Sequence, residues 1–278
     1  MSDVATRTRL PGVLRLGAAR TGYEVRTFFR ERDAVVFIFA YPIIMLAIFA
    51  TVFGQDGATV GPPPGIPFAQ YFLPGMVATG IMLSSFQQLA ISIAVERDDG
   101  GLKRLHGTPL PPASFFLGKI GGVLATSVVQ TALLLAAAAL FFDVPLPSTA
   151  TAWGTFAWVF VLGIAAGTLC SVAFSSVPGS GKSASAVVTP IVLVLQFISG
   201  VFFVYNDLPS WMQHVASVFP LKWMAQGMRS VFLPPSAQSW EVSGSWQHGA
   251  TAAILLGWAV AALVVGVRTF RWQRRDDG

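Results

Sequence analysis

The sequence contains little charge and only one cysteine. Asp, Glu, Lys and Arg make up 11% of the 278 residues, against about 25% in an ordinary soluble domain. Hydrophobic residues make up 54%, and the mean hydropathy is +0.64. This shortage of charge excludes an ordinary soluble domain and indicates an integral membrane protein. The single cysteine, Cys170, excludes a disulfide within one chain, and we interpret it as a small apolar filler.

Long apolar runs follow one another along most of the chain. A helix needs about 20 mostly apolar residues to cross a bilayer, whereas a strand of a membrane barrel needs only about 10. The runs here have helix length, so we predict an all-α membrane protein that forms a single transmembrane domain over residues 1–278. The six predicted transmembrane helices cover residues 34–53, 71–95, 114–141, 152–175, 186–205 and 249–268.

Basic residues are distributed unevenly between the two sides of this predicted bundle. Of the 18 lysines and arginines, all but Lys222 and Arg229 fall in or beside the N-terminal segment, the second and fourth connections, or the tail. Basic residues near the ends of spans stay cytoplasmic. We therefore predict that both termini and the connection 96–113 face the cytoplasm. The pI of 9.8 then reflects topology and contact with anionic membrane lipids, and we expect no nucleic-acid partner.

Two further segments are too apolar to be free loops. Residues 1–33 interleave arginines with apolar side chains, which predicts an amphipathic helix on the cytoplasmic membrane surface. This helix either anchors lipid headgroups or also grips a partner. Residues 206–248 carry recurring apolar side chains broken by prolines, and we predict an external re-entrant helical hairpin there. Within it, Arg229 can pair with Glu241 or Asp207, or can extend to the membrane interface.

Signals of catalysis and of metal binding are missing. Residues 178–183 resemble a phosphate-binding loop, but that pattern needs a glycine at position 176, which is serine. The three histidines are isolated, so we predict no catalytic residue and no metal site. Ionisable residues are missing from the predicted spans apart from Lys119 near a cytoplasmic end. Because such residues normally mark ion-coupled pathways, a transporter built this way has to take its energy from outside the membrane.

A compact polar insert between two apolar runs is the most informative stretch of the chain. It reads Glu96-Arg97-Asp98-Asp99-Gly100-Gly101-Leu102-Lys103-Arg104-Leu105-His106-Gly107-Thr108-Pro109-Leu110, and we interpret it as a docking site for a soluble partner. Its pattern resembles the cytoplasmic loop of bacterial ABC transporter permeases of the type-2 export family, which are type V exporter-like. A second match to that family runs through Ser199-Gly200-Val201-Phe202-Phe203, Leu208-Pro209-Ser210-Trp211 and Gly227-Met228-Arg229.

The resemblance covers nearly the whole chain and implies partners. In this family the segment after the second span forms a short coupling helix that rests in a groove of a separate ABC ATPase, present in two copies per complex. ATP and Mg would then be bound by that ATPase, with no cofactor on this chain. A second permease, identical or related, would complete the pathway. The residues at the matching coupling positions are Glu96, Arg97, Lys103, Arg104, Thr108 and Pro109.

The resemblance also implies a pathway lined by the second and fifth spans and capped outside by the hairpin. The pathway candidates are Ser85, Gln88, Ser92, Pro190, Gln196, Phe197 and Ser199. Polar side chains of this kind also hold membrane helices together by hydrogen bonds, which is the alternative role for each. The candidates for an external gate are Pro209, Trp211, Pro220 and Arg229.

These expectations combine into one predicted function. We expect the membrane-spanning permease subunit of an ATP-driven exporter in a bacterial plasma membrane, which moves an amphipathic or hydrophobic substrate such as a lipid, drug or glycan outward by alternating access. Hydrolysis would take place on the partner ATPase, so the chain itself would not be an enzyme. The alternative is a multi-pass membrane scaffold or intramembrane enzyme that works without an ATPase.

Overall fold

The computed structural model describes residues 11–270 and 272, so the first ten residues of the predicted segment 1–33 and most of the basic tail lie outside it. Within the described residues, six helices are long and apolar enough to cross a membrane. This confirms the prediction of an all-α membrane protein. The six spans are α2 (Arg32–Phe53), the continuous helix Phe68–Asp98, α6 (Pro112–Phe142), α7 (Ala150–Phe174), α8 (Gly181–Ile198) and α11 (His248–Thr269).

The second span is the centre of the bundle and is not a uniform α-helix. It consists of α3 (Phe68–Met82), a π-helical segment labelled η2 (Leu83–Gln88) and α4 (Leu89–Asp98). Nearly all of α3 is buried, because α2 packs on one side of it and α10 (Pro220–Phe232) on another. Farther along, α4 packs against α8. The second span therefore touches elements at both ends of the molecule.

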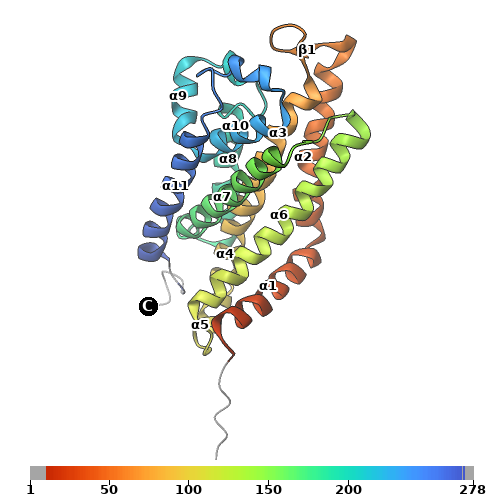
Figure 1. Cartoon of the computed structure of the whole chain (residues 1–278). Helices are drawn as coiled ribbons and strands as arrows, with labels where there is room; N and C mark the ends of the chain where they lie inside the picture. Colours follow the sequence, from red (N-terminus) through yellow and green to blue (C-terminus); the bar gives the residue numbers. More distant parts are fainter. Residues whose placement is uncertain (1–10, 271, 273–278) are drawn as a thin grey trace, which may run out of the picture.

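The first described helix, α1 (Val13–Arg30), runs obliquely beside the first part of α6 (Figure 1). Three glycines of α6 make this close approach possible. A Cβ at Gly118, Gly121 or Gly122 would overlap the side chain of Arg20, Thr21 or Glu24, respectively. The opposite face of α1 exposes apolar side chains such as Leu14 and Phe29. The predicted amphipathic helix is thus present over residues 13–30, and its position on a membrane surface stays a prediction.

Short elements gather at the two ends of the bundle (Figure 1). One end holds α5 (Gly101–His106) together with the beginning of α1 and the end of α11. The other end holds the segment 199–247 and a two-stranded antiparallel ribbon. The elements at that end are η1 (Gln55–Gly57), β1 (Thr59–Val60), β2 (Ile66–Pro67), η3 (Tyr205–Asp207), α9 (Ser210–Val218), α10 and η4 (Pro235–Trp240).

The fifth span differs from its predicted range of 186–205. The helix α8 begins at Gly181, because Ser180 and Ser183 form a reciprocal capping box that satisfies free backbone groups of the first turn. This box occupies the run that resembles a phosphate-binding loop. The helix ends at Ile198, and Gly200 follows with a φ of 71°, a conformation that glycine adopts without steric cost. The predicted extension to residue 205 was therefore wrong.

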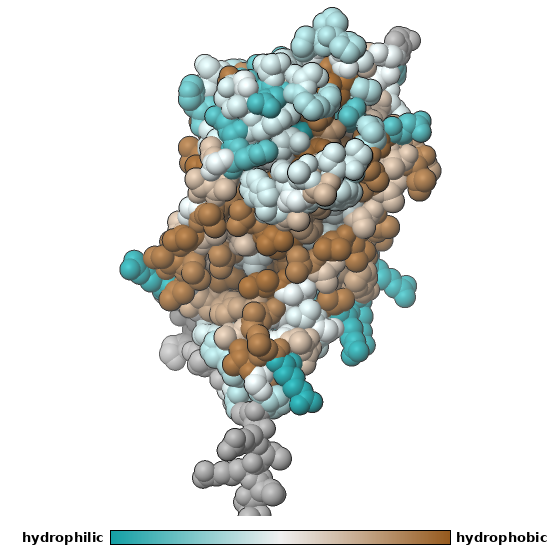
Figure 2. Space-filling view, viewed as in Figure 1, coloured by the Kyte–Doolittle hydropathy of each residue, from teal (hydrophilic) through white to brown (hydrophobic). Residues whose placement is uncertain are grey.

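The outer surface carries a broad band of hydrophobic residues. Figure 2 shows this band across the middle of one face, with hydrophilic residues gathered above and below it. Many large apolar side chains of the spanning helices are exposed, including Phe37 on α2, Val194 on α8 and Val267 on α11. A soluble protein rarely exposes apolar patches of this extent, whereas contact with lipid tails requires them.

Candidate functional site

The helix α5 presents basic side chains at one end of the bundle. It starts after Gly100, which has a φ of 72°, and a side chain at this φ would be strained. Leu102 is fully buried and fixes the helix to the bundle, whereas Lys103 and Arg104 are exposed. After the helix, Thr108 Oγ1 donates a hydrogen bond of 2.6 Å to the carbonyl of Leu105. We call residues 101–109, which end at the exposed Thr108 and Pro109, the docking segment.

Behind the docking segment, four charged side chains from three helices form an ion-pair cluster. Lys119 of α6 is almost fully buried and lies between two carboxylates: its Nζ is 2.8 Å from Glu24 Oε2 and also pairs with Glu96 Oε1. Arg20 approaches Glu24 Oε1 to 2.7 Å and Glu96 Oε2 to 3.9 Å. We call Arg20, Glu24, Glu96 and Lys119 the inner cluster. A buried ammonium is costly unless it is paired, and here two cations neutralise two carboxylates.

A cavity of about 580 Å³ adjoins the inner cluster. Its walls come from α1, the second span with the turn after it, α5 and α6. Polar side chains of the second span, among them Gln88 and Ser92, face it beside apolar ones. Arg104 and Leu105 of the docking segment also line it. The cavity therefore lies directly beneath the surface that α5 presents.

Arg97 has a different position from the one predicted for a docking residue. Its side chain is buried, and its Nη2 donates a hydrogen bond of 2.6 Å to the carbonyl of Ser175 at the end of α7. A second, longer contact of 3.5 Å reaches the carbonyl of Pro178. In this arrangement Arg97 ties the end of α4 to the turn between α7 and α8. Of the six predicted coupling residues, Glu96 and Arg97 are thus engaged inside the chain, and the other four are exposed.

The predicted pathway residues are not gathered in one place. Ser85 is buried against Gly167 of α7, and its hydroxyl donates to the carbonyl of Ile81. Gln196 is also buried, and its Oε1 accepts a hydrogen bond of 3.0 Å from the hydroxyl of Tyr41 on α2. Both therefore join helices of the same chain. Gln88 and Ser92 line the cavity, Pro190 and Phe197 are exposed on α8, and Ser199 is buried after the end of α8.

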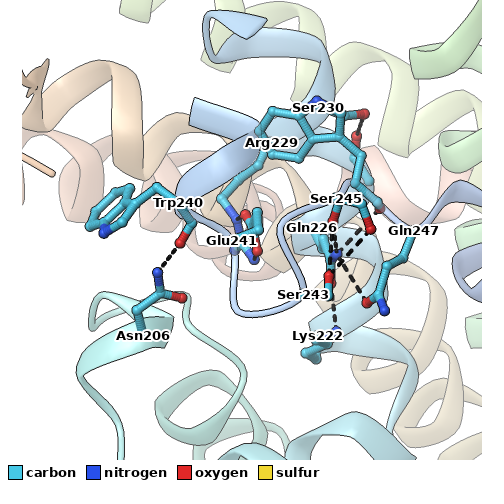
Figure 3. A network of polar contacts seen from close by, with 12 residues as sticks. Asn206, Lys222, Gln226, Arg229, Ser230, Trp240, Glu241, Ser243, Ser245 and Gln247 are labelled. Carbon is cyan, nitrogen blue, oxygen red and sulfur yellow. Dashed lines mark hydrogen bonds and ion pairs between the residues drawn. The ribbon is translucent and has the colours of Figure 1, made fainter. Parts of the chain in front are cut away.

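The opposite end of the molecule contains a second polar network, drawn in Figure 3. Arg229 of α10 and Glu241 are both buried and form a bidentate pair, with N–O distances of 2.6 Å and 3.2 Å. This confirms one of the three expected arrangements for Arg229. Gln226 Nε2 contacts the carbonyls of Ser245 and Trp246 and Oε1 of Gln247, at distances from 3.2 to 3.4 Å.

Lys222 completes this network from one turn earlier on α10. Its Nζ donates a hydrogen bond of 2.5 Å to Gln226 Oε1 and lies 3.5 Å from the centre of the Trp223 ring. Burial, and to a smaller extent the charge of Arg229, lowers the pKa of Lys222 to about 8. We call Lys222, Gln226, Arg229 and Glu241 the outer cluster.

The four predicted gate residues divide into two pairs. Pro209 and Trp211 are exposed at the beginning of α9. Pro220 is buried as the first residue of α10, where its fixed φ suits a helix start, and Arg229 is buried in the outer cluster. The helix α10 lies between α3, α7 and α11, so protein encloses it on several sides. Its position relative to a membrane stays a prediction.

The sequence pattern marks Glu96 as a coupling residue and Lys119 as an isolated charge, but it does not predict that they belong to an inner cluster with Arg20 and Glu24. Two signals in the sequence point to it. Lys119 is the one charged residue inside an apolar run of helix length, and such a residue needs a partner. Glu24 is the only carboxylate between residues 4 and 30, in a segment otherwise rich in arginine. Their pairing depends on the packing of α1 against α6, which the sequence pattern does not reveal.

Comparison with known proteins decides the family. Residues 19–233 match the profile of the family described as ABC-2 type transporter. The chain belongs to the ABC-2 type transporter family. The matched range begins within α1 and ends just after α10, so it contains the inner cluster, the docking segment and most of the outer cluster. Membership in the ABC-2 type transporter family confirms the predicted resemblance.

Individual relatives agree with this assignment. The inner membrane transport permease YadH of Escherichia coli K12 is 24% identical over 193 residues, which cover 69% of this chain and 74% of the relative. The protein of that name from Shigella flexneri gives the same values. ABC transporter G family member 20 of Dictyostelium discoideum is 25% identical over 178 residues, which cover 63% of this chain but only 24% of that protein. The chain is therefore a multi-pass plasma membrane protein and a transport permease subunit of an ABC transporter.

Proposed function

We propose that this ABC-2 permease is the membrane half of an ATP-driven exporter and that a separate ABC ATPase docks on its α5 end. The observation that carries the proposal is the construction of α5. Leu102 holds the short helix rigidly to the bundle, while Lys103 and Arg104 are exposed on it. Exposed charges suit a contact that is broken and remade in each cycle, because they steer association without burying a large apolar surface.

The charge distribution supports an external source of energy. In the six spanning helices, ionisable side chains occur only near the ends, and Lys119 is already paired with Glu24 and Glu96. A proton-coupled or ion-coupled transporter normally keeps such groups deep in the bundle. ATP and Mg, bound on the ATPase, would supply the energy, and α5 would deliver it. With the basic residues placed according to the positive-inside rule, α5 and both termini face the cytoplasm.

The outer surface supports an assembly of two permeases. The helix α8 exposes Pro190, Ile191, Val194 and Phe197 along one stretch, and α2 is the least buried of the six spans. A second permease, identical or related, would cover these helices and enclose a pathway with them. An amphipathic or hydrophobic substrate suits walls of this kind and would move outward by alternating access.

The docking proposal is tested by charge reversal at Lys103 and Arg104, the two exposed basic side chains of α5. We would purify the tagged permease with its ATPase in mild detergent and measure ATP hydrolysis in lipid nanodiscs. The double variant Lys103→Glu/Arg104→Glu is expected to lose the co-purifying ATPase and at least about tenfold of the hydrolysis rate, because a buried like-charge contact costs 1.4 kcal/mol or more.

The matched control is Arg268→Glu, which reverses an exposed basic side chain at the end of α11. It should keep the ATPase and its activity. A double variant that retains a stoichiometric, active ATPase would refute docking on α5. If the unmodified permease purified without any ATPase, the exporter proposal would be rejected in favour of a scaffold or an intramembrane enzyme.

A further inference from the structure

Arg97 bonds to two different parts of the inner end, one through its backbone and one through its side chain. Its carbonyl accepts a hydrogen bond of 3.2 Å from the amide of Gly100, the residue after which α5 starts. Its guanidinium donates to the carbonyl of Ser175 at 2.6 Å and reaches the carbonyl of Pro178 at 3.5 Å. The start of α5 and the turn between α7 and α8 are therefore both bonded to this one residue.

The partners of the Arg97 guanidinium are backbone carbonyls at the end of a helix. Ser175 directly follows the last residue of α7. The last carbonyls of a helix have no partner within it and carry a partial negative charge. Arginine suits this place, because its planar group offers several N–H donors and stays charged when it is buried. A buried cation without such bonds is costly, so these bonds hold Arg97 and the α7–α8 turn together.

The first turn of α8 packs directly on the end of α4. A Cβ at Gly181, the first residue of α8, would lie 3.0 Å from the Cα of Val95 and 3.2 Å from the Cβ of Asp98. The glycine thus allows α8 to approach α4 more closely than a larger residue would. Ser180, which caps α8, belongs to the turn that Arg97 contacts. The end of α4 and the beginning of α8 therefore have little room to move independently.

The preceding residue of α4, Glu96, faces another side of the bundle. It pairs with Lys119 of α6, whereas Arg97 contacts the α7–α8 turn. Successive residues of a helix are about 100° apart, which places the two contacts on different faces of α4. Glu96 is partly exposed, and Lys119 has Glu24 as a second partner, so this pair can be exchanged. Arg97 is buried, and its side of α4 is the firmer attachment.

We propose that Arg97 is a positioning residue that transmits a movement of the docking segment to the α7–α8 turn and so to the fifth span. This inference rests on the ATPase docking proposed above and adds the route by which its movement enters the bundle. A displaced α5 moves α4, because α5 packs mainly against α4. The bonds of Arg97 and the contact at Gly181 then move α8, which exposes Pro190 and Phe197, while the Glu96 pair is exchanged.

The route is tested by hydrogen exchange on the complex of permease and ATPase in lipid nanodiscs. Mass spectrometry would compare the exchange before and after trapping with ATP and vanadate, in peptides that cover 101–109, 112–120 and 181–190. In the unmodified complex, 101–109 and 181–190 should both respond. In Arg97→Gln, the ATPase should stay bound and 101–109 should still respond, because Arg97 is buried. The response of 181–190 should fall about threefold or more, the scale on which substitutions change coupling.

Two further variants separate transmission from a structural role of Arg97. Arg97→Lys should recover part of the response of 181–190, because an ammonium can still donate to a carbonyl. Arg268→Gln, which removes an exposed basic side chain at the end of α11, should keep the full response. A purely structural role would change the exchange of the resting protein and leave the response to ATP intact.

A matched pair of glycine variants tests the same route with Arg97 in place. Gly181→Ala should weaken the response of 181–190, because the added methyl group pushes α8 away from α4. Gly179→Ala lies in the adjoining turn, where a Cβ would meet nothing within 4 Å, and it should keep the response. This pair decides the question even if Arg97→Gln fails to fold.

Three results would overturn the proposed role of Arg97. The first is an unchanged response of 181–190 in both Arg97→Gln and Gly181→Ala. The second is a response of 112–120 without one of 181–190 in the unmodified complex, which would assign the route to Glu96 and Lys119. The third is loss of the ATPase from folded Arg97→Gln, which would place Arg97 in the docking contact itself.

Failure of the proposed function gives a different result. In that case the unmodified permease would bind no ATPase, or its docking segment would not respond to ATP and vanadate. There would then be no docking movement for Arg97 to transmit, and both proposals would be rejected together. A bound ATPase and a responding docking segment, with no effect of Arg97→Gln or Gly181→Ala, would reject the route alone.

Discussion

The two charged clusters at opposite ends of this permease are built in different ways. The outer cluster joins residues that are close in sequence: Arg229 and Glu241 are 12 residues apart, and both are buried. The inner cluster joins α1, α4 and α6, and its two contacts with Lys119 span 95 and 23 residues. The side chain of Glu96 keeps 30% of its full solvent exposure and lies beside a cavity. The outer cluster thus closes one segment, whereas the inner cluster holds separate helices together where they can still move.

The two clusters predict different motions at the two ends of the permease. A bidentate pair that is largely buried is costly to separate, so the elements at the outer end should move as one body. Lys119 has two carboxylate partners on two helices, and it can keep one while releasing the other. We therefore expect rearrangements during transport to begin at the inner end, next to the docking segment.

The largest effect on stability is expected from breaking the outer pair. In Glu241→Gln, Arg229 stays buried without a carboxylate, which should cost about 3–5 kcal/mol of unfolding free energy. Thermal unfolding in detergent, followed by tryptophan fluorescence, would measure it. Asp207→Asn serves as the control, because Asp207 is an exposed carboxylate in the same segment. An unchanged transition temperature in Glu241→Gln would show that the outer end is not held by this pair.

A smaller effect is expected at the inner cluster. Lys119→Met leaves Glu24 and Glu96 facing each other, but Arg20 still pairs with Glu24 and Glu96 is partly hydrated. The expected loss is about 2 kcal/mol, the scale of a hydrogen bond to a charged group. Adding Glu96→Gln to Lys119→Met should recover part of the loss, because it removes the carboxylate that has lost its partner. If the second change weakened the protein further, the cluster would not act through charge balance.

The smallest effect is expected in the pH dependence of stability, through Lys222. Its pKa is lowered to about 8 in the folded chain from an ordinary value of 10.5. Between these values the unfolded chain binds more protons than the folded chain, so this residue makes stability rise with pH across that window. The transition temperature of the unmodified permease should therefore rise relative to that of Lys222→Met from pH 8 to pH 9.5. Lys182→Met, which alters an exposed lysine, should show no such trend.

Much of the fold could be predicted because the relevant signal is local. Each spanning helix is an apolar run of sufficient length, and the polar insert around Lys103 follows from the shortage of charge elsewhere. The end of α8 was missed because apolar residues continue past Ile198 into Val201, Phe202 and Phe203. There the helix ends at the backbone conformation of Gly200 and not at a change in hydropathy.

The candidate site was less predictable because it depends on contacts between distant residues. Arg97 and Arg104 look equivalent in the sequence, yet Arg97 is buried against the carbonyl of Ser175 and Arg104 is exposed. Lys119 was noticed as an isolated charge, but its partners come from two other helices. A sequence pattern shows which residues need a partner. It does not show which partner the packing provides.

The π-helical segment Leu83–Gln88 affects the direction in which the later side chains of the second span point. A π-helical turn holds more residues than an α-helical turn, so it absorbs one residue without displacing the helix on either side. One residue corresponds to a rotation of about 100° in an α-helix of 3.6 residues per turn. If the segment became regular α-helix with all its residues retained, α4 would turn by that angle, and Glu96 and Arg97 would point away from Lys119 and Ser175. The six residues of this segment, in the middle of the bundle, thus set the rotation of α4 about its own axis.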